Sequence, residues 1–114
     1  MKKTLGWRII LISGALTVFG ATWALAGGNP HVHEAVSHAE EAVEHGMQGH
    51  ADAVVTHAEA ALNHAHAAQK EVNNPHLNEG VHELEEAIAH GGQGHAEVAT
   101  KHAKSAVMHL KEVH

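Results

Sequence analysis

The chain has 114 residues, among them 15 histidines, 13 acidic residues, seven basic residues and no cysteine. Without cysteine it can form no disulfide, no thiolate metal site and no CxxCH-type haem attachment. The formal net charge of −6 with neutral histidine argues against nucleic acid and anionic lipid as partners, and it favours cations.

The first 26 residues are organised like a cleaved export signal. Two lysines precede an apolar stretch over residues 9–19, and Ala24-Leu25-Ala26 has the small-residue pattern of a signal-peptidase site. The stretch is short for a transmembrane helix, so an uncleaved membrane anchor is the weaker alternative. We expect residues 1–26 to be removed and residues 27–114 to be exported from the cytoplasm.

Cleavage would change the composition of the protein. It would remove all three aromatic residues and leave four lysines against 13 carboxylates, a net charge of −9. A small core without aromatic side chains stabilises a fold only modestly, so we expect bound metal to add stability.

The part after residue 26 repeats itself with a shift of 45 residues. Asn29-Pro30-His31 returns as Asn74-Pro75-His76, and HGMQGH at 45–50 returns as HGGQGH at 90–95. Asn followed by Pro is a helix start signal, and the glycines favour a tight turn. Each copy therefore predicts a helical hairpin, one over residues 29–73 and one over residues 74–114. The expected helices are 31–45, 50–72, 76–90 and 95–113.

Apolar residues recur every seven positions along these helices. Small residues, mostly alanine, occupy positions a and d of the heptad and would pack the two helices of a hairpin closely. A second row at position e would face the other hairpin; it comprises Val36, Val43, Val55, Leu62, Val81, Ile88 and Val107, and Thr100 interrupts it. The predicted fold class is all-α, an antiparallel four-helix bundle built from two duplicated hairpins. Two independent hairpins are the alternative.

Eleven of the histidines share position g of the same heptad. Seven residues make two helical turns, so the histidines of one helix form a stripe with about 10.5 Å between members. Two antiparallel helices place such stripes opposite each other. The expected pairs are His31–His64, His38–His57, His45–His50, His76–His109, Glu83–His102 and His90–His95.

These pairs predict metal binding. Metal–nitrogen bonds are about 2 Å long, so two members of one stripe cannot share an ion, whereas a cross-helix pair can. Imidazole with a neighbouring carboxylate suits Cu(II), Ni(II) and Zn(II). The candidate carboxylates are Glu34, Glu41, Glu79, Glu83 and Glu86, and His82 is a substitute for the imidazole missing at position 83.

Other interpretations are weaker. A lone exposed histidine is usually only solvated, but eleven in one register need a common cause. We expect no enzyme, because the zinc-protease motif HExxH is incomplete at 82–86 and no oriented nucleophile is evident. A haem or electron-transfer bundle is hard to reconcile with an alanine-rich core. A pH-responsive structural or interaction protein with incidental metal binding is the main alternative.

The stretches HVHEAVSHAEEAVEHGMQGH (31–50) and HGGQGHAEVATKH (90–102) resemble the small metal-binding protein family, histidine-rich exported proteins of Gram-negative bacteria. The resemblance implies a periplasmic helical bundle that binds several divalent ions and acts in metal sequestration or tolerance. Cu(II) would be favoured, with Ni(II), Zn(II) and Co(II) as alternatives. We expect a monomer, with association of further copies through shared metal as a further possibility. The implied ligands are His31, His38, His45, His50, His57, His64, His76, His90, His95, His102 and His109, and Glu83 departs from the pattern.

Overall fold

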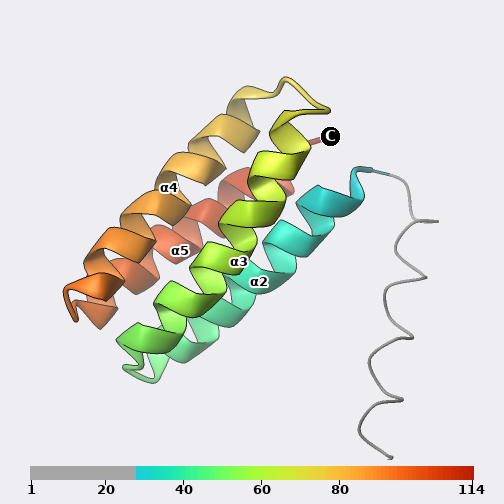
Figure 1. Ribbon diagram of the computed structural model, residues 1–114. Coiled ribbons are helices and arrows are strands. Elements are labelled where there is room, and N and C mark those ends of the chain that lie inside the picture. Colours follow the sequence, from blue (N-terminus) through green and yellow to red (C-terminus); the bar gives the residue numbers. More distant parts are fainter. Residues whose placement is uncertain (1–27) are drawn as a thin grey trace, which may run out of the picture.

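The computed structural model describes residues 28–114, so the expected export signal lies outside the described residues. Four helices lie antiparallel, side by side (Figure 1): α2 (Pro30–Met47), α3 (Ala51–Gln69), α4 (Pro75–Gly92) and α5 (Ala96–Lys111). α2 packs along α3 and α5, and α4 packs along the same two helices, which closes the bundle. The predicted all-α four-helix bundle is confirmed. None of the four described helices is long and apolar enough to cross a membrane.

The two Asn-Pro signals begin α2 and α4, as expected. The Oδ1 atom of Asn29 accepts a hydrogen bond from the backbone N–H of His31 at 2.8 Å. Asn74 does the same for His76, also at 2.8 Å. Each bond satisfies a donor that the first helical turn leaves unpaired, and the proline between them needs no such partner.

The two HGxQGH turns have the same geometry. Gly49 and Gly94 adopt φ values of +83° and +82°, a left-handed conformation in which glycine avoids the penalty of a Cβ atom. The N–H groups of the histidines that follow donate to the carbonyl oxygens of His45 and His90, each at 3.0 Å. The turn thus brings the first and last histidine of each hexapeptide close together.

The ends of the helices differ from the prediction. α2 and α4 continue two residues into the glycine turns, to Met47 and Gly92, because the preceding residues, Gly46 and Gly91, are buried against the core. α3 stops at Gln69, three residues early, since the chain needs residues 70–74 to cross to α4 and a residue before proline avoids helical angles. α5 ends at Lys111 rather than at residue 113.

The a and d residues of all four helices form one core. The first copy contributes only valine and alanine: Val32, Ala35, Ala39, Ala42, Val54, Ala58, Ala61, Ala65 and Ala68. The second copy adds three fully buried leucines: Leu77, Leu84 and Leu110. The shared core therefore combines three large side chains from the second copy with mostly small side chains from the first.

The predicted e row forms only part of the contact between hairpins. Val36, Val43, Leu62, Ile88 and Val107 are half-buried and pack on the outside of the core, whereas Val81 belongs to the core itself. The row alone was expected to join the hairpins. Because the a and d side chains are so small, residues from all four helices meet in the centre instead.

Two glycines allow the hairpins to approach closely. A Cβ atom on Gly46 would overlap the side chain of Thr100, and one on Gly91 would lie 2.8 Å from Cγ2 of Val55. Thr100 is buried at this contact, and its hydroxyl donates to the carbonyl oxygen of Ala96 at 2.6 Å. The threonine that interrupts the e row thus has its hydrogen bond satisfied.

Candidate metal centre

The register histidines line two grooves, one between α2 and α3 and one between α4 and α5. The α2–α3 pair forms one side of the bundle and the α4–α5 pair forms the opposite side (Figure 1). The two grooves therefore lie on opposite sides as well. Most of these histidines are half-buried, and His50, His76 and His95 are exposed. The imidazoles are therefore held by the helices while remaining accessible from solvent.

The expected cross-helix pairs are neighbours in the structure. In the first groove the ring centroids of His31–His64, His38–His57 and His45–His50 are 5.8, 6.5 and 6.2 Å apart. In the second groove His76–His109 and His90–His95 are 5.5 and 6.1 Å apart, and Glu83 Oε1 lies 2.7 Å from His102 Nδ1. Their role as ligands stays a prediction.

The sequence predicted that the paired histidines lie directly opposite each other. In the structure they are offset along the helix axis. His57 lies closer to His45, at 4.9 Å with nearly parallel rings, than to His38 at 6.5 Å. His64 likewise stacks on His38 at 5.6 Å. Side chains lean toward the N-terminus of their own helix, so opposing stripes on antiparallel helices lean in opposite directions. The result is a staggered column in which each imidazole except those at the two ends lies between two imidazoles of the facing helix, and not a series of separate pairs.

The column in the second groove is interrupted. His90 stacks on His102 at 5.3 Å, which repeats the contact of His45 with His57. Next to this pair, the carboxylate of Glu83 occupies the position that His38 has in the first groove. His76 and His109 form a separate pair with their Nδ1 atoms 3.3 Å apart.

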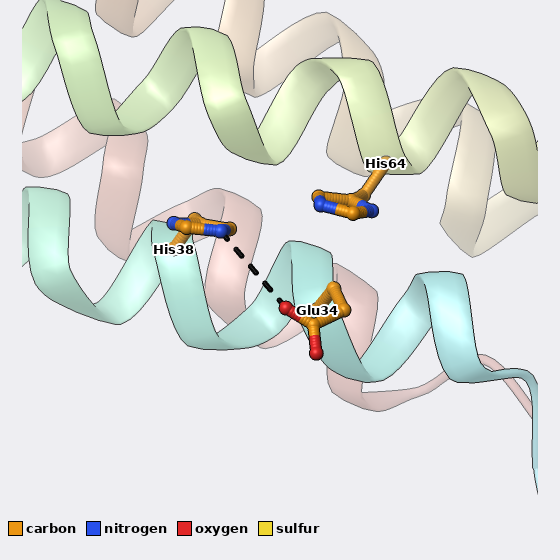
Figure 2. A group of neighbouring side chains, drawn as sticks. All are labelled: Glu34, His38 and His64. Carbon is orange, nitrogen blue, oxygen red and sulfur yellow. Dashed lines mark ion pairs between the residues drawn. The ribbon is translucent and has the colours of Figure 1, made fainter. Parts of the chain in front are cut away.

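Two groups of three side chains could hold a metal ion, and both lie in the first groove. Within residues 28–114 these groups are Glu34 with His38 and His64, and His38 with Glu41 and His57. In each group the ligand atoms all lie within 4.8 Å of one another. Figure 2 shows the first group, with Glu34 and His38 on α2 and His64 reaching across from α3.

The second group already has nearly the spacing of metal ligands. Glu41 Oε1 lies 3.1 Å from His38 Nδ1 and 3.2 Å from His57 Nδ1. Bonds of about 2.0 Å place adjacent ligand atoms about 2.8–3.3 Å apart in square-planar or tetrahedral sites. In the first group Glu34 Oε1 and His38 Nε2 are 4.0 Å apart, close to the separation of ligands on opposite sides of an ion.

The carboxylates of the second copy are arranged differently. Glu79 is exposed and belongs to neither group, and Glu83 hydrogen-bonds His102. His82 is exposed, with Nε2 lying 3.8 Å from Glu86 Oε2 on the next turn. The structure therefore places His82 beside Glu86 and not in the position left by the missing imidazole.

Within residues 28–114, two imidazole nitrogens, one in each hairpin, are buried without a hydrogen-bond partner. These are the Nδ1 atoms of His45 and His90. The two histidines occupy equivalent positions, 45 residues apart, at the turn end of each groove. A buried polar atom without a partner costs free energy, and a cation bound there would offset that cost.

The groove also favours the neutral form of one histidine. Burial lowers the pKa of His64 below its ordinary value of 6.5, and repulsion from His38 and His31 acts in the same direction, while Glu34 opposes it. Neutral imidazole is the form that binds metal, so His64 keeps its lone pair at neutral pH.

A family model described as Small metal-binding protein matches residues 3–113. The chain belongs to the small metal-binding protein family. The resemblance indicated by the HGxQGH turns and their flanking heptads is thereby confirmed. No curated protein matches the chain.

The ligands of this small metal-binding protein are therefore metal ions, and the grooves supply the imidazole and carboxylate groups that can hold them. Heptad spacing was sufficient to find the histidine pairs. It also predicted Glu41 beside the pair of His38 and His57. It did not find the diagonal group, in which His64 joins Glu34 and His38, because that group depends on the lean of side chains relative to the helix axis.

Proposed function

We propose that this small metal-binding protein binds and buffers several divalent transition-metal ions in the periplasm, with Cu(II) favoured. The main support is the group of His38, Glu41 and His57, in which the carboxylate oxygen lies 3.1 and 3.2 Å from the two imidazole nitrogens. Two imidazoles, one carboxylate and water form a nitrogen–oxygen shell. Such shells hold Cu²⁺ more tightly than Ni²⁺, Co²⁺ or Zn²⁺.

The accessible position of these ligands fits buffering, because His38 and His57 are half-buried and Glu41 is exposed. Within residues 28–114 these three ligands lie on helices and none of them lies in a loop. Ions can therefore enter and leave without unfolding of the bundle. Several imidazole pairs in one groove would give several equivalents of similar affinity with modest selectivity.

The test is equilibrium dialysis of the purified protein against Cu(II), Ni(II), Zn(II) and Co(II), with bound metal read by elemental analysis. We expect several equivalents per chain and tightest retention of Cu(II). A control variant with His66→Ala and His114→Ala, outside the heptad register, should bind as much as the wild type. Binding of less than one equivalent of every ion would contradict the proposal.

The periplasmic location is supported only by the leader-like sequence of residues 1–26. Fractionation of expressing cells, followed by intact-mass measurement, tests it. We expect the protein in the periplasmic fraction, with the mass of a chain that begins at Gly27. A full-length chain in the membrane fraction would contradict cleavage.

A further inference from the structure

One imidazole belongs to both metal-binding groups. His38 is the residue that the group with Glu34 and the group with Glu41 have in common. Its two nitrogens face different carboxylates: Nε2 lies 4.0 Å from Glu34, and Nδ1 lies 3.1 Å from Glu41. His64 and His57 lie near it on α3, with ring centroids 5.6 and 6.5 Å away.

The chemistry of imidazole limits what His38 can do. A neutral imidazole has one nitrogen with a free lone pair, and its other nitrogen carries a proton. It can therefore bind one ion at a time, and binding a second ion would require loss of the remaining proton. If Nδ1 binds an ion beside Glu41, the N–H at Nε2 faces Glu34. If Nε2 binds an ion beside Glu34, the N–H at Nδ1 faces Glu41.

Each carboxylate would therefore have two roles. Metal-binding histidines usually donate their second N–H to a carboxylate or carbonyl, which fixes the tautomer and strengthens the ligand. Here Glu41 is already within hydrogen-bond distance of Nδ1, at 3.1 Å. Glu34 lies 4.0 Å from Nε2 and would accept that bond after a small shift of its side chain. Filling one site stabilises the tautomer that the other site cannot use.

The second copy provides a comparison within the same chain. Position 83, equivalent to His38, carries a glutamate, and Glu79, Glu86, His102 and His109 occupy the other equivalent positions. Within residues 28–114 no group of three forms there. The loss of both groups together indicates that the residue at this position is required for each of them.

We propose that His38 makes the two groups alternative sites for a single ion, each using a different nitrogen and tautomer of the same ring. The inference rests on the proposed metal binding and adds that these two groups together count as one equivalent. A buffer built this way keeps its ion when either carboxylate is lost, because the ion moves to the other group.

Conservative variants test the sharing by counting Cu(II) ions per chain with native mass spectrometry. We expect Glu34→Gln and Glu41→Gln singly to keep the wild-type number, and the double variant and His38→Ala each to lose one ion. Loss of one ion from each single variant and two from the double would show independent sites and overturn the proposal. An unchanged number in both the double variant and His38→Ala would overturn it as well.

The matched control for lost charge is Glu59→Gln with Glu85→Gln, two exposed carboxylates outside both groups. It should keep the wild-type number of ions. If it loses an ion as the double variant does, net charge and not the shared ligand explains the result.

A second measurement identifies the nitrogen. With ¹⁵N-labelled protein and Zn(II), NMR of the His38 ring should show the ion on Nδ1 in Glu34→Gln and on Nε2 in Glu41→Gln. The same nitrogen in both variants, or both nitrogens bound at once in the wild type, would overturn the proposal. A wild type that binds no Cu(II) or Zn(II) would instead refute the proposed function itself.

Discussion

Glu83 Oε1 lies 2.7 Å from His102 Nδ1 across the groove between α4 and α5, where the equivalent pair of the first copy is His38 and His57. The carboxylate accepts a hydrogen bond from the imidazole instead of stacking beside it. This single difference divides the second column of imidazoles into two short pieces.

Replacing Glu83 with histidine should restore the column. In Glu83→His the new ring would lie between His102 and His109. Because imidazole is a good Cu(II) ligand, we expect this variant to bind about one further equivalent of Cu(II) in equilibrium dialysis. Glu85→His adds a histidine at an exposed position outside the register and is the control. An equal gain in both variants would show that the placement of the ring does not matter.

Copper should stabilise the fold by joining helices. Binding only to the folded state adds about 2.7 kcal/mol when free ion is 100 times Kd. For a bundle of this size each kcal/mol raises Tm by about 4–8 °C, so we expect an increase above about 10 °C by circular dichroism. His76→Gln and His109→Gln should each reduce the increase, and the double variant should reduce it little further. An unchanged Tm with saturating Cu(II) would argue for isolated surface sites.

The stability of the metal-free protein should fall on acidification, partly through His64. Burial lowers the pKa of His64 in the folded protein, so below 6.5 the unfolded chain takes up a proton more readily and is favoured. Urea unfolding at pH 7.5 and 5.5 should show a smaller difference in His64→Gln than in the wild type. The control His114→Gln should behave as the wild type does. A pH dependence unchanged in His64→Gln would contradict this assignment.

Acid should also release the metal. Protons compete with metal for imidazole as the pH falls through the histidine range near 6.5. Calorimetric titration with Cu(II) should show strong binding at pH 7.5 and little at pH 4.5. Undiminished binding at pH 4.5 would exclude imidazole as the main ligand.

Because Gly46 packs directly against Thr100, we expect that even one added methyl group at position 46 destabilises the protein. A Cβ atom at Gly46 would overlap Thr100 and lie 3.0 Å from Cγ2 of Val54, so Gly46→Ala should destabilise the protein by about 1–3 kcal/mol. At Gly92, also helical, nothing lies within 4 Å of a Cβ atom. Gly92→Ala should therefore stabilise by about 0.5–1 kcal/mol. Chemical denaturation measures both, and opposite signs are the expected result.

Local signals in the sequence predicted much of this structure. Asn29 and Asn74 mark helix starts through their own side chains, and the HGxQGH turns carry glycine where left-handed angles occur. Heptad spacing then identified which histidines are neighbours, because antiparallel pairing around a short turn leaves one register.

The remaining features arise from contacts between distant segments. Gly46 stays helical because it packs against Thr100, 54 positions further along the chain, and nothing local signals that contact. His57 lies closer to His45 than to His38 because the side chains of the two facing helices lean in opposite directions. For the same reason the sequence predicted the group around Glu41 but not the diagonal one, in which His64 joins Glu34 and His38.

The three buried leucines all belong to the second copy, and the uninterrupted imidazole column belongs to the first. Duplication has thus produced two specialised halves, one that provides the largest core side chains and one that holds both groups of three candidate ligands. Two copies of the first half paired with each other would bring alanine against alanine and leave the interior underfilled. The half that holds both ligand groups therefore relies on the leucines of the other half to fill the shared core.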